Sequence, residues 1–537
     1  MSNHAEFTFA GKTKNRIHDA LRYHVFQDTK ESVDNIKSLW ANQDLKKPHK
    51  YRVNDFFVFT YALLNGEPAA SIIKYLRLWK EKYAGLEVFS CVEPLECSIR
   101  LNNLLWIYYI GSDSIERGDR EFLLTLIRLQ ADLTDLFCEH RNHNNHIFIQ
   151  GKNLLLAGLL FSDRKLSQTW LRKGQQTVHS CLKYQIDDNG VHIERSRMYQ
   201  KVILSELLEL TAIIKACSGL IDAAFKDFLY AKVKTMLEYD RIITHCNGKY
   251  SLWGDGYFGD RLIRFVPVVS SYDKCADYEK NILAWRSCLN LPVFDLEPTQ
   301  LQLLTNRSGF IYSRFEDYAL EINAGTALTK QDFAKGHIHS DILSFTLSKG
   351  DKEVIGHAGT YAYDEQSIKY FRGTRGHNTI MVDGLEQHGN QDKSSPYHYA
   401  DGCLLKCECV DNADIIEVSH NGYKRIGVTH KRGIKHIKHE KFIEVVDTIA
   451  GMGKHGFEAF LHFAQGLECS ISGNRVCIKD HAEIVIDAPP GVTLELLFAR
   501  DGAYYSKSFY NKVPAYLFRA SGNFFNNVTI RTKIFLK

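Results

Sequence analysis

The hydrophobic periodicity of the chain changes near residue 290, and no other feature constrains the fold as strongly. Before this point, apolar residues recur at the spacing of one helix face, most clearly in 119–140 and 201–217. The same spacing is found in 56–64, 69–83, 152–162, 166–184 and 223–243. Many helices of similar length with short connections are typical of an antiparallel bundle or an α/α toroid. The first half is therefore predicted to be helical.

The second half has the pattern of strands. It follows LNLPVFDLEPTQ, which carries two prolines and is predicted to be a linker. Short alternating or β-branched runs, separated by Gly, Asp and Asn, then occur at 318–323, 342–347, 379–382, 415–418, 442–446, 492–498 and 528–535. This pattern indicates an antiparallel sandwich. We therefore expect a multidomain α+β chain, with a helical domain over 1–295 and an antiparallel β-sandwich domain over 305–537.

Composition argues against several classes of protein. The 67 basic and 63 acidic residues give a net charge of only +4, which does not indicate a nucleic-acid-binding protein. No window offers the roughly 18 uninterrupted apolar residues that a membrane span needs. The 13 cysteines are scattered without paired CxxC motifs, which argues against a zinc ribbon or a disulfide framework.

The N-terminal sequence bears on location. The first 26 residues lack the apolar core of a signal peptide. Together with the scattered thiols, this favours a reducing, cytoplasmic setting. A leader removed ahead of the printed sequence would give the same appearance, which leaves the periplasm as the alternative.

Two polar segments interrupt the helical half. HRNHNNHIFIQGKN places Asn144, Asn145 and His146 between two apolar stretches, where they are costly to bury without hydrogen bonds. A cluster of helix caps and loop residues is the alternative, because Asn is a good cap. DDNGVHIERSRMYQ places Tyr199 at the start of the next apolar helix. One tyrosine among 27 is normally structural, so Tyr199 alone carries little weight.

The strand half contains clustered histidines. In KGHIHSDILSF, His337 and His339 are two residues apart and can face the same way on a strand. This spacing suits two ligands of one metal, or one ligand beside one catalytic imidazole. Downstream, His357 and His377 could complete a three-histidine zinc site with His339. Unrelated surface or core histidines are the alternative.

Taken together, four segments resemble the heparinase II/III-like family of polysaccharide lyases. They are NNH at 144–146, GVHIERSRMY at 190–199, GHIHSDILSF at 336–345, and AGTYAYD with GHNTIMVDG at 358–384. Their order agrees with the family from about residue 90 to 390. The resemblance implies an N-terminal α/α toroid (an incomplete barrel), a C-terminal antiparallel β-sandwich, and an active site in the cleft between them.

The resemblance also implies residue roles. Asn145 and His146 match the Asn-His pair of the catalytic centre, Tyr199 matches the catalytic tyrosine, and His337 matches the histidine near the substrate carboxylate. These positions imply β-elimination in a uronic-acid-containing acidic polysaccharide or oligosaccharide, with heparin or heparan sulfate as the first expectation. Tyr199 would protonate the leaving oxygen, and either Tyr199 or His146 would be the base.

Further positions are expected to bind metal or substrate. His339 and His377 match metal-ligand positions of the family, whose third ligand is an Asp. Here that position is His357, so the expectation is either a structural zinc held by three imidazoles or a site without metal. Substrate contacts are expected from charged and amide groups that suit planar anions, namely Arg195, Arg372, Arg375 and Asn144.

The sequence is also compatible with two alternative functions. A uronate C5-epimerase needs the same proton abstraction, and a non-catalytic carbohydrate-binding protein could use the same scaffold. Asp255 and Asp260, in LWGDGYFGD, are expected to fix a loop rather than touch substrate. The oligomeric state is not predicted.

Overall fold

The computed structural model describes residues 55–64, 66–83, 93–138, 144–160, 165–216, 219–244, 250–256, 304–305, 309–325, 337–350, 352–388, 400–500 and 503–537. The chain divides into two compact units, one helical and one built of sheets. Each unit is described by itself. The predicted linker and Asp260 lie outside the described residues, and the contiguous boundary between 295 and 305 stays a prediction.

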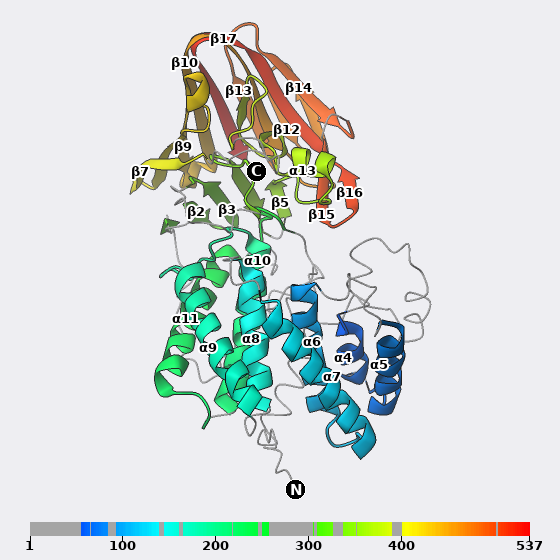
Figure 1. The fold of residues 1–537 in the computed structure, drawn as a ribbon. Helices are drawn as coiled ribbons and strands as arrows, with labels where there is room; N and C mark the ends of the chain where they lie inside the picture. Colours follow the sequence, from blue (N-terminus) through cyan, green and yellow to red (C-terminus); the bar gives the residue numbers. More distant parts are fainter. Residues whose placement is uncertain are drawn as a thin grey trace. The chain divides into compact units, whose positions relative to one another are not determined.

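The helical unit follows the predicted amphipathic segments except for α6, which was not predicted and is buried over most of its length. Its helices are α4 (Phe57–Leu64), α5 (Ala69–Tyr83), α6 (Pro94–Gly111), α7 (Arg117–Leu136), α8 (Asn145–Leu160), α9 (Lys165–Gln185), and most of α10 (Arg197–Ala216) and α11 (Ala223–Ile243) (Figure 1). Helix α7 buries Leu123, Leu126 and Ile127, the apolar face that the sequence indicated. Helix α8 begins seven residues earlier than predicted, because Ile147, Phe148 and Ile149 continue its buried surface.

Buried polar side chains join three of these helices. The Lys152 ammonium of α8 contacts the carboxylates of Glu206 and Glu209 on α10. Glu209 also accepts hydrogen bonds from Asn102 Nδ2 at 3.1 Å and from the Trp106 indole, both on α6. All five residues are buried. Because a buried charge needs a partner, this cluster fixes how α6, α8 and α10 pack.

The sheet unit contains two large antiparallel sheets. The first has the order β1-β2-β3-β4-β5, with β1 (Leu304–Thr305), β2 (Phe310–Phe315), β3 (Tyr318–Asn323), β4 (Phe345–Lys349) and β5 (Lys352–Ile355). The second follows β11-β12-β13-β17-β10-β9-β8-β7, with β14 paired to β17 and β6 paired to β10. Its strands are β6 (Ile380–Val382), β7 (Gly402–Val410), β8 (Ala413–His420), β9 (Val428–Ile437), β10 (Phe442–His462), β11 (Cys469–Ser472), β12 (Arg475–Ile478), β13 (Ala482–Asp487), β14 (Thr493–Phe498) and β17 (Tyr516–Leu536).

The two sheets share one hydrophobic core. Leu320 and Leu347 of the first sheet belong to the same buried cluster as Val445, Ile484 and Ile534 of the second. Alternation in β9 matches this arrangement, because its buried and exposed positions interchange along VTHKRGIKHI. Two smaller elements complete the unit: the hairpin of β15 (Tyr504–Ser508) and β16 (Asn511–Pro514), and helix α13 (Glu365–Phe371).

Two segments from the helical half of the sequence belong to the sheet unit. They are residues 193–200, which include the first turn of α10, and residues 240–256. The loop around Gly254 fits closely, because Gly254 has a φ of +65° and a Cβ there would lie 2.7 Å from the His337 carbonyl oxygen. Asp255 N–H donates to that same oxygen at 2.9 Å. Short segments from both halves of the sequence thus meet inside one unit.

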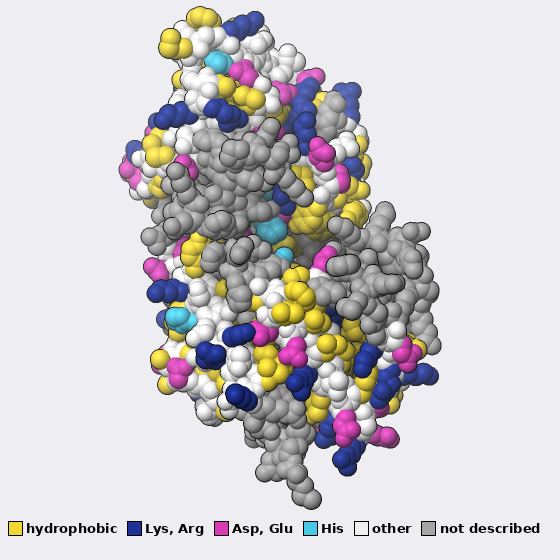
Figure 2. Space-filling view, viewed as in Figure 1, with side chains coloured by type: hydrophobic (Ala, Val, Ile, Leu, Met, Phe, Trp, Pro, Cys, Tyr) yellow, Lys and Arg dark blue, Asp and Glu magenta, His cyan; other side chains and the backbone are white. Residues whose placement is uncertain are grey.

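Basic and acidic side chains are intermingled on the described surface that Figure 2 shows, in keeping with the small net charge. Within the described helices, none is both long and apolar enough to cross a membrane.

Candidate active site

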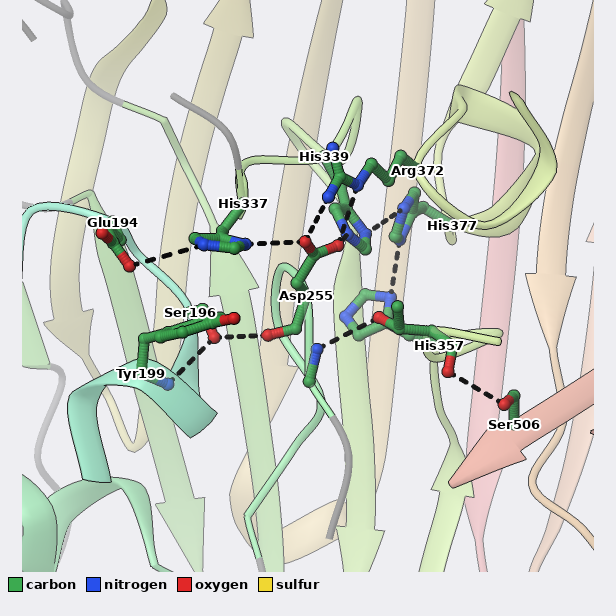
Figure 3. Close-up of polar contacts among 12 residues, drawn as sticks. Glu194, Ser196, Tyr199, Asp255, His337, His339, His357, Arg372, His377 and Ser506 are labelled. Atoms are coloured by element: carbon green, nitrogen blue, oxygen red, sulfur yellow. Dashed lines mark hydrogen bonds and ion pairs between the residues drawn. The ribbon is translucent and has the colours of Figure 1, made fainter. Parts of the chain in front are cut away.

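Tyr199 and His337 stack on each other in the sheet unit. Their ring centroids lie 3.9 Å apart with an interplanar angle of 24° (Figure 3). Tyr199 is the third residue of α10, and its N–H donates to Ser196 Oγ at 3.2 Å. The Ser196 hydroxyl in turn donates to the Asp255 carbonyl oxygen. The structure therefore brings together two of the four residues predicted to be catalytic.

His337 lies between two buried carboxylates. Its Nδ1 is 2.7 Å from Asp255 Oδ2, and its Nε2 is 3.8 Å from Glu194 Oε2. The first distance is a hydrogen bond, whereas the second is too long for one. The His337 side chain is 19% exposed, so the ring is within reach of a ligand. Asp255 therefore fixes the ring orientation and leaves Nε2 without a direct hydrogen bond to Glu194.

Asp255 is the centre of the polar cluster. Besides His337, its carboxylate binds His339 Nε2 at 2.8 Å and Arg372 Nε at 2.9 Å, and a second Arg372 nitrogen contacts Oδ2. Burial alone would raise the pKa of Asp255, but the Arg372 charge and the hydrogen bonds from both histidines hold it well below its usual range. Asp255 is thus an ionised anchor that orients three side chains, a larger role than the loop-fixing one expected.

A row of imidazoles continues behind Asp255. His339 Nδ1 lies 3.2 Å from His377 Nε2, and His377 Nδ1 lies 3.1 Å from His357 Nδ1. All three side chains are buried. Burial lowers the pKa of His339, and it lowers those of His357 and His377 well below the usual value. The three rings are therefore neutral at physiological pH.

Comparison with known protein families identifies the scaffold. The heparinase II/III N-terminus matches residues 72–275, and the heparinase II/III-like C-terminal domain matches residues 306–519. The chain belongs to the heparinase II/III family. Both matched regions carry motifs that were singled out in the sequence, so the predicted family is confirmed.

Individual relatives of this heparinase II/III family member are distant in sequence. A heparin-sulfate lyase of Pedobacter heparinus is 21% identical over 371 residues, which are 67% of this chain and 52% of that protein. The chain thus spans about half the length of this curated relative. A crystal structure of heparinase III matches all of the chain and 86% of its own, with a TM-score of 0.74 at 15% identity. A mutant heparan sulfate lyase HepC from Pedobacter heparinus matches all of the chain and 85% of its own, with a TM-score of 0.65 at 16% identity. These likenesses confirm the predicted fold, an α/α toroid followed by antiparallel sheets.

The predicted zinc site does not fit the imidazoles as they lie. A zinc ion needs ligand lone pairs that converge on one point at about 2.0–2.1 Å. His377 instead contacts its two neighbours through nitrogens on different edges of its ring, and His339 is bound to Asp255 and His377. No group of three or more His, Cys, Asp or Glu side chains among the described residues is arranged to hold a metal ion.

The other two predicted catalytic residues lie in the helical unit. Asn145 and His146 form the first turn of α8, where Asn145 is buried and His146 is partly exposed. Asn144 acts as a cap, because its Oδ1 accepts the His146 N–H at 3.1 Å. The alternative of a helix cap is thus observed for Asn144. Catalytic contacts of Asn145 and His146, and a substrate contact of Asn144, stay predictions.

The three predicted substrate-binding arginines have different surroundings. Arg372 forms a two-pronged ion pair with Asp255, and Arg375 pairs with Glu458 at 3.1 Å. Arg195 lines a small cavity of about 10 Å³ together with Asp341. Their contacts with substrate stay predictions. In the described structure, the first role of the Arg372 guanidinium is to hold Asp255.

Sequence reasoning did not single out Glu194 or Tyr363. Tyr363 is nearly half exposed, its hydroxyl hydrogen-bonds the Tyr199 side chain, and its ring lies 5.2 Å from the Arg372 guanidinium. Both residues occur inside motifs that were quoted, ERSRMY and AGTYAYD. Their position inside these motifs was therefore the only signal in the sequence, because glutamate and tyrosine are not unusual residues in such segments.

Proposed function

We propose that the chain is a polysaccharide lyase that cleaves a uronic-acid-containing acidic polysaccharide or oligosaccharide by β-elimination. The observation that carries this proposal is the Tyr199 phenol stacked on an imidazole that Asp255 orients. Family membership supports it, as does the heparin-sulfate lyase among the relatives. Heparin and heparan sulfate are therefore the first substrates to test.

The first chemical demand is to make the C5 proton of the uronate acidic. Removal of that proton builds enolate-like charge on a carboxylate that is already negative. His337 meets this demand when its Nε2 carries a proton. Asp255 holds Nδ1, and Nε2 lies on the opposite edge of the ring, where it has no direct hydrogen bond to Glu194. Asn145 is proposed as a second donor to the same carboxylate. Preorganised donors of this kind are worth about 3 kcal/mol each in the transition state.

The second demand is proton transfer at C5 and O4. The Tyr199 hydroxyl is proposed to donate its proton to the leaving O4 oxygen. When the C5 proton and O4 lie on the same face of the sugar, Tyr199 begins as the phenolate, takes the C5 proton and passes it to O4. When they lie on opposite faces, His146 takes the C5 proton and the Tyr199 hydroxyl protonates O4.

Substrate binding is proposed for positively charged and amide side chains. Arg195, Arg375 and Asn144 are proposed to contact carboxylate or sulfate groups of the chain. Arg372 does so only through the face of its guanidinium that Asp255 does not occupy. Neutral imidazoles behind Asp255 are too deeply buried to take part in binding.

The experiment that tests the proposal compares Tyr199→Phe with Tyr361→Phe. Removal of the Tyr199 hydroxyl should lower kcat about 10²- to 10⁴-fold and leave KM nearly unchanged, because only the proton donor is lost. Tyr361 lies in the separate AGTYAYD motif, with its ring centroid 5.9 Å from that of Phe371, so its variant is a control that removes a tyrosine hydroxyl outside the proposed catalytic group and should keep activity. The readout is the ultraviolet absorbance of unsaturated uronate ends, on a panel of heparin, heparan sulfate, heparosan, chondroitin, hyaluronan and alginate. Full activity of Tyr199→Phe would refute the assignment.

Two other functions are separate outcomes of the same assay. A uronate C5-epimerase would incorporate solvent deuterium at C5 without forming unsaturated ends. A non-catalytic carbohydrate-binding protein would bind one polymer of the panel and do neither. We propose a cytoplasmic location, with the periplasm as the alternative, which fractionation of the native host would decide.

A further inference from the structure

A continuous chain of polar contacts leads from His337 into the sheet unit. It runs from the Asp255 carboxylate to His339 at 2.8 Å, then to His377 at 3.2 Å and to His357 at 3.1 Å (Figure 3). Each of the three rings is only 1% exposed. The residues come from the segment before β4, the loop after β5 and the loop before β6.

The Asp255 carboxylate, at one end of this row of imidazoles, determines which nitrogen of each ring carries the proton. Because Asp255 can only accept, His339 must carry its proton on Nε2 and present a lone pair at Nδ1. His377 then donates from Nε2 and accepts at Nδ1, so His357 must donate from Nδ1. One set of tautomers satisfies all three bonds.

The far end of the chain returns to the segment that holds Asp255. The His357 ring packs edge-on against Trp253, with centroids 4.1 Å apart. The Trp253 indole N–H is itself anchored, because it donates to Glu321 Oε2 at 3.0 Å. Trp253 and Asp255 are separated only by Gly254. The contacts therefore form a closed circuit that fixes the loop on both sides of Gly254.

We propose that His339, His377 and His357 form a metal-independent hydrogen-bonded chain that positions Asp255 and, through it, His337. These are positioning residues, because all three are buried and are linked to His337 through the Asp255 carboxylate. A metal ion would require three lone pairs that point inward, whereas His339 Nδ1 and His377 Nδ1 already accept hydrogen bonds from the neighbouring imidazoles. The effect on catalysis rests on the proposed lyase function, but the proton positions and the metal content do not.

The first test measures metal content and proton positions in the full, unaltered chain. Mass spectrometry of the purified protein should find metal far below one ion per chain, and chelator treatment should leave the melting temperature unchanged. Neutron crystallography should place hydrogen on Nε2 of His339, Nε2 of His377 and Nδ1 of His357. Stoichiometric zinc whose removal lowers the melting temperature would overturn the proposal, as would any other set of tautomers.

The second test compares His357→Leu with His357→Asn. Leucine cannot donate to His377, so kcat should fall roughly 10- to 100-fold with KM within about twofold, as is typical when support for a site residue is lost. The amide of Asn can replace the Nδ1–H donor and should restore most of kcat. Equal activity of both variants, or equal loss in both, would contradict a donor role.

Lack of lyase activity in both the natural protein and the Asn variant, with the tautomers as stated, would refute the proposed lyase function. The proposal of the hydrogen-bonded imidazoles would then be upheld. If His357→Leu does not fold, the neutron map and the metal analysis of the natural chain still decide. Failure of the two proposals is therefore distinguishable.

Discussion

The two units bury polar clusters of opposite character. In the helical unit, Lys152 neutralises the carboxylates of Glu206 and Glu209 between packed helices. In the sheet unit, one ionised carboxylate, Asp255, is followed by neutral imidazoles. The first cluster depends on full charges and joins structural elements. The second depends on one ionised carboxylate and directed hydrogen bonds, and it adjoins the partly exposed His337 ring, which is why it is the one suited to chemistry.

The largest expected effect is the loss of the buried cation. Lys152→Met removes the buried cation that contacts two carboxylates, and removal of one member of a buried ion pair costs about 3–5 kcal/mol. Urea unfolding at neutral pH measures this loss as a decrease in the free energy of unfolding. Lys173→Met is the matched control, because its pair with Asp135 is partly exposed and should be worth at most about 1 kcal/mol. Equal effects of the two variants would remove the distinction between the clusters.

Acid should weaken the sheet unit before the helical unit. Burial lowers the pKa of His436 and of His462 to about 4, below the usual 6.5. Since the unfolded chain binds these protons more readily, the stability is complete above pH 6.5 and is lost as the pH falls towards 4. At pH 5 the loss should be roughly 2 kcal/mol for each histidine. Hydrogen exchange at pH 7 and pH 5, corrected for intrinsic rates, should show earlier opening of sheet peptides. Uniform opening would contradict this.

A smaller effect of opposite sign is expected at Asp341. Burial raises the pKa of Asp341 to about 7, against the charge of Arg195. Its contribution to stability is complete below the unfolded pKa near 3.8 and is lost as the pH rises through 7. Asp341→Asn keeps an acceptor for Asn323 and should gain about 1–2 kcal/mol more at pH 8 than at pH 5.5. Thermal unfolding at the two pH values measures the gain, and a gain independent of pH would refute it.

Local patterns predicted much of the fold. Apolar spacing located the helices of the helical unit except α6, because it depends on neighbouring residues. Alternation located fewer than half of the described strands, namely β3, β4, β6, β8, β10, β14 and β17. The strand β10 was predicted only over 442–446 but extends over Phe442–His462. A bulge between Ala450 and Lys454 interrupts its pairing with β17 and hides the alternation. The same bulge explains why the partner β17 was recognised only in its second half.

The site was predicted in part. The motifs located Tyr199 and His337, which do stack, but gave no reason to place Asp255 between His337 and His339. A single acidic residue in a glycine-containing loop has no periodic signature, and its partners are more than 80 residues away in sequence. Likewise, periodicity does not reveal that residues 193–200 pack with sheets rather than helices.

The length of β10 has a consequence for how the family member tolerates insertions. Its last residue, His462, binds Asn378 Oδ1 through its N–H and the Arg375 carbonyl through Nε2, and its own carbonyl accepts from Gly356. The length of β10 therefore determines where His462 lies, and His462 supports the turns that carry His357 and His377. An extra residue near Gly453 can be accommodated by the existing bulge. An extra residue after Phe457 would turn the His462 side chain to the opposite face of the sheet, and both turns would lose their hydrogen bonds to His462.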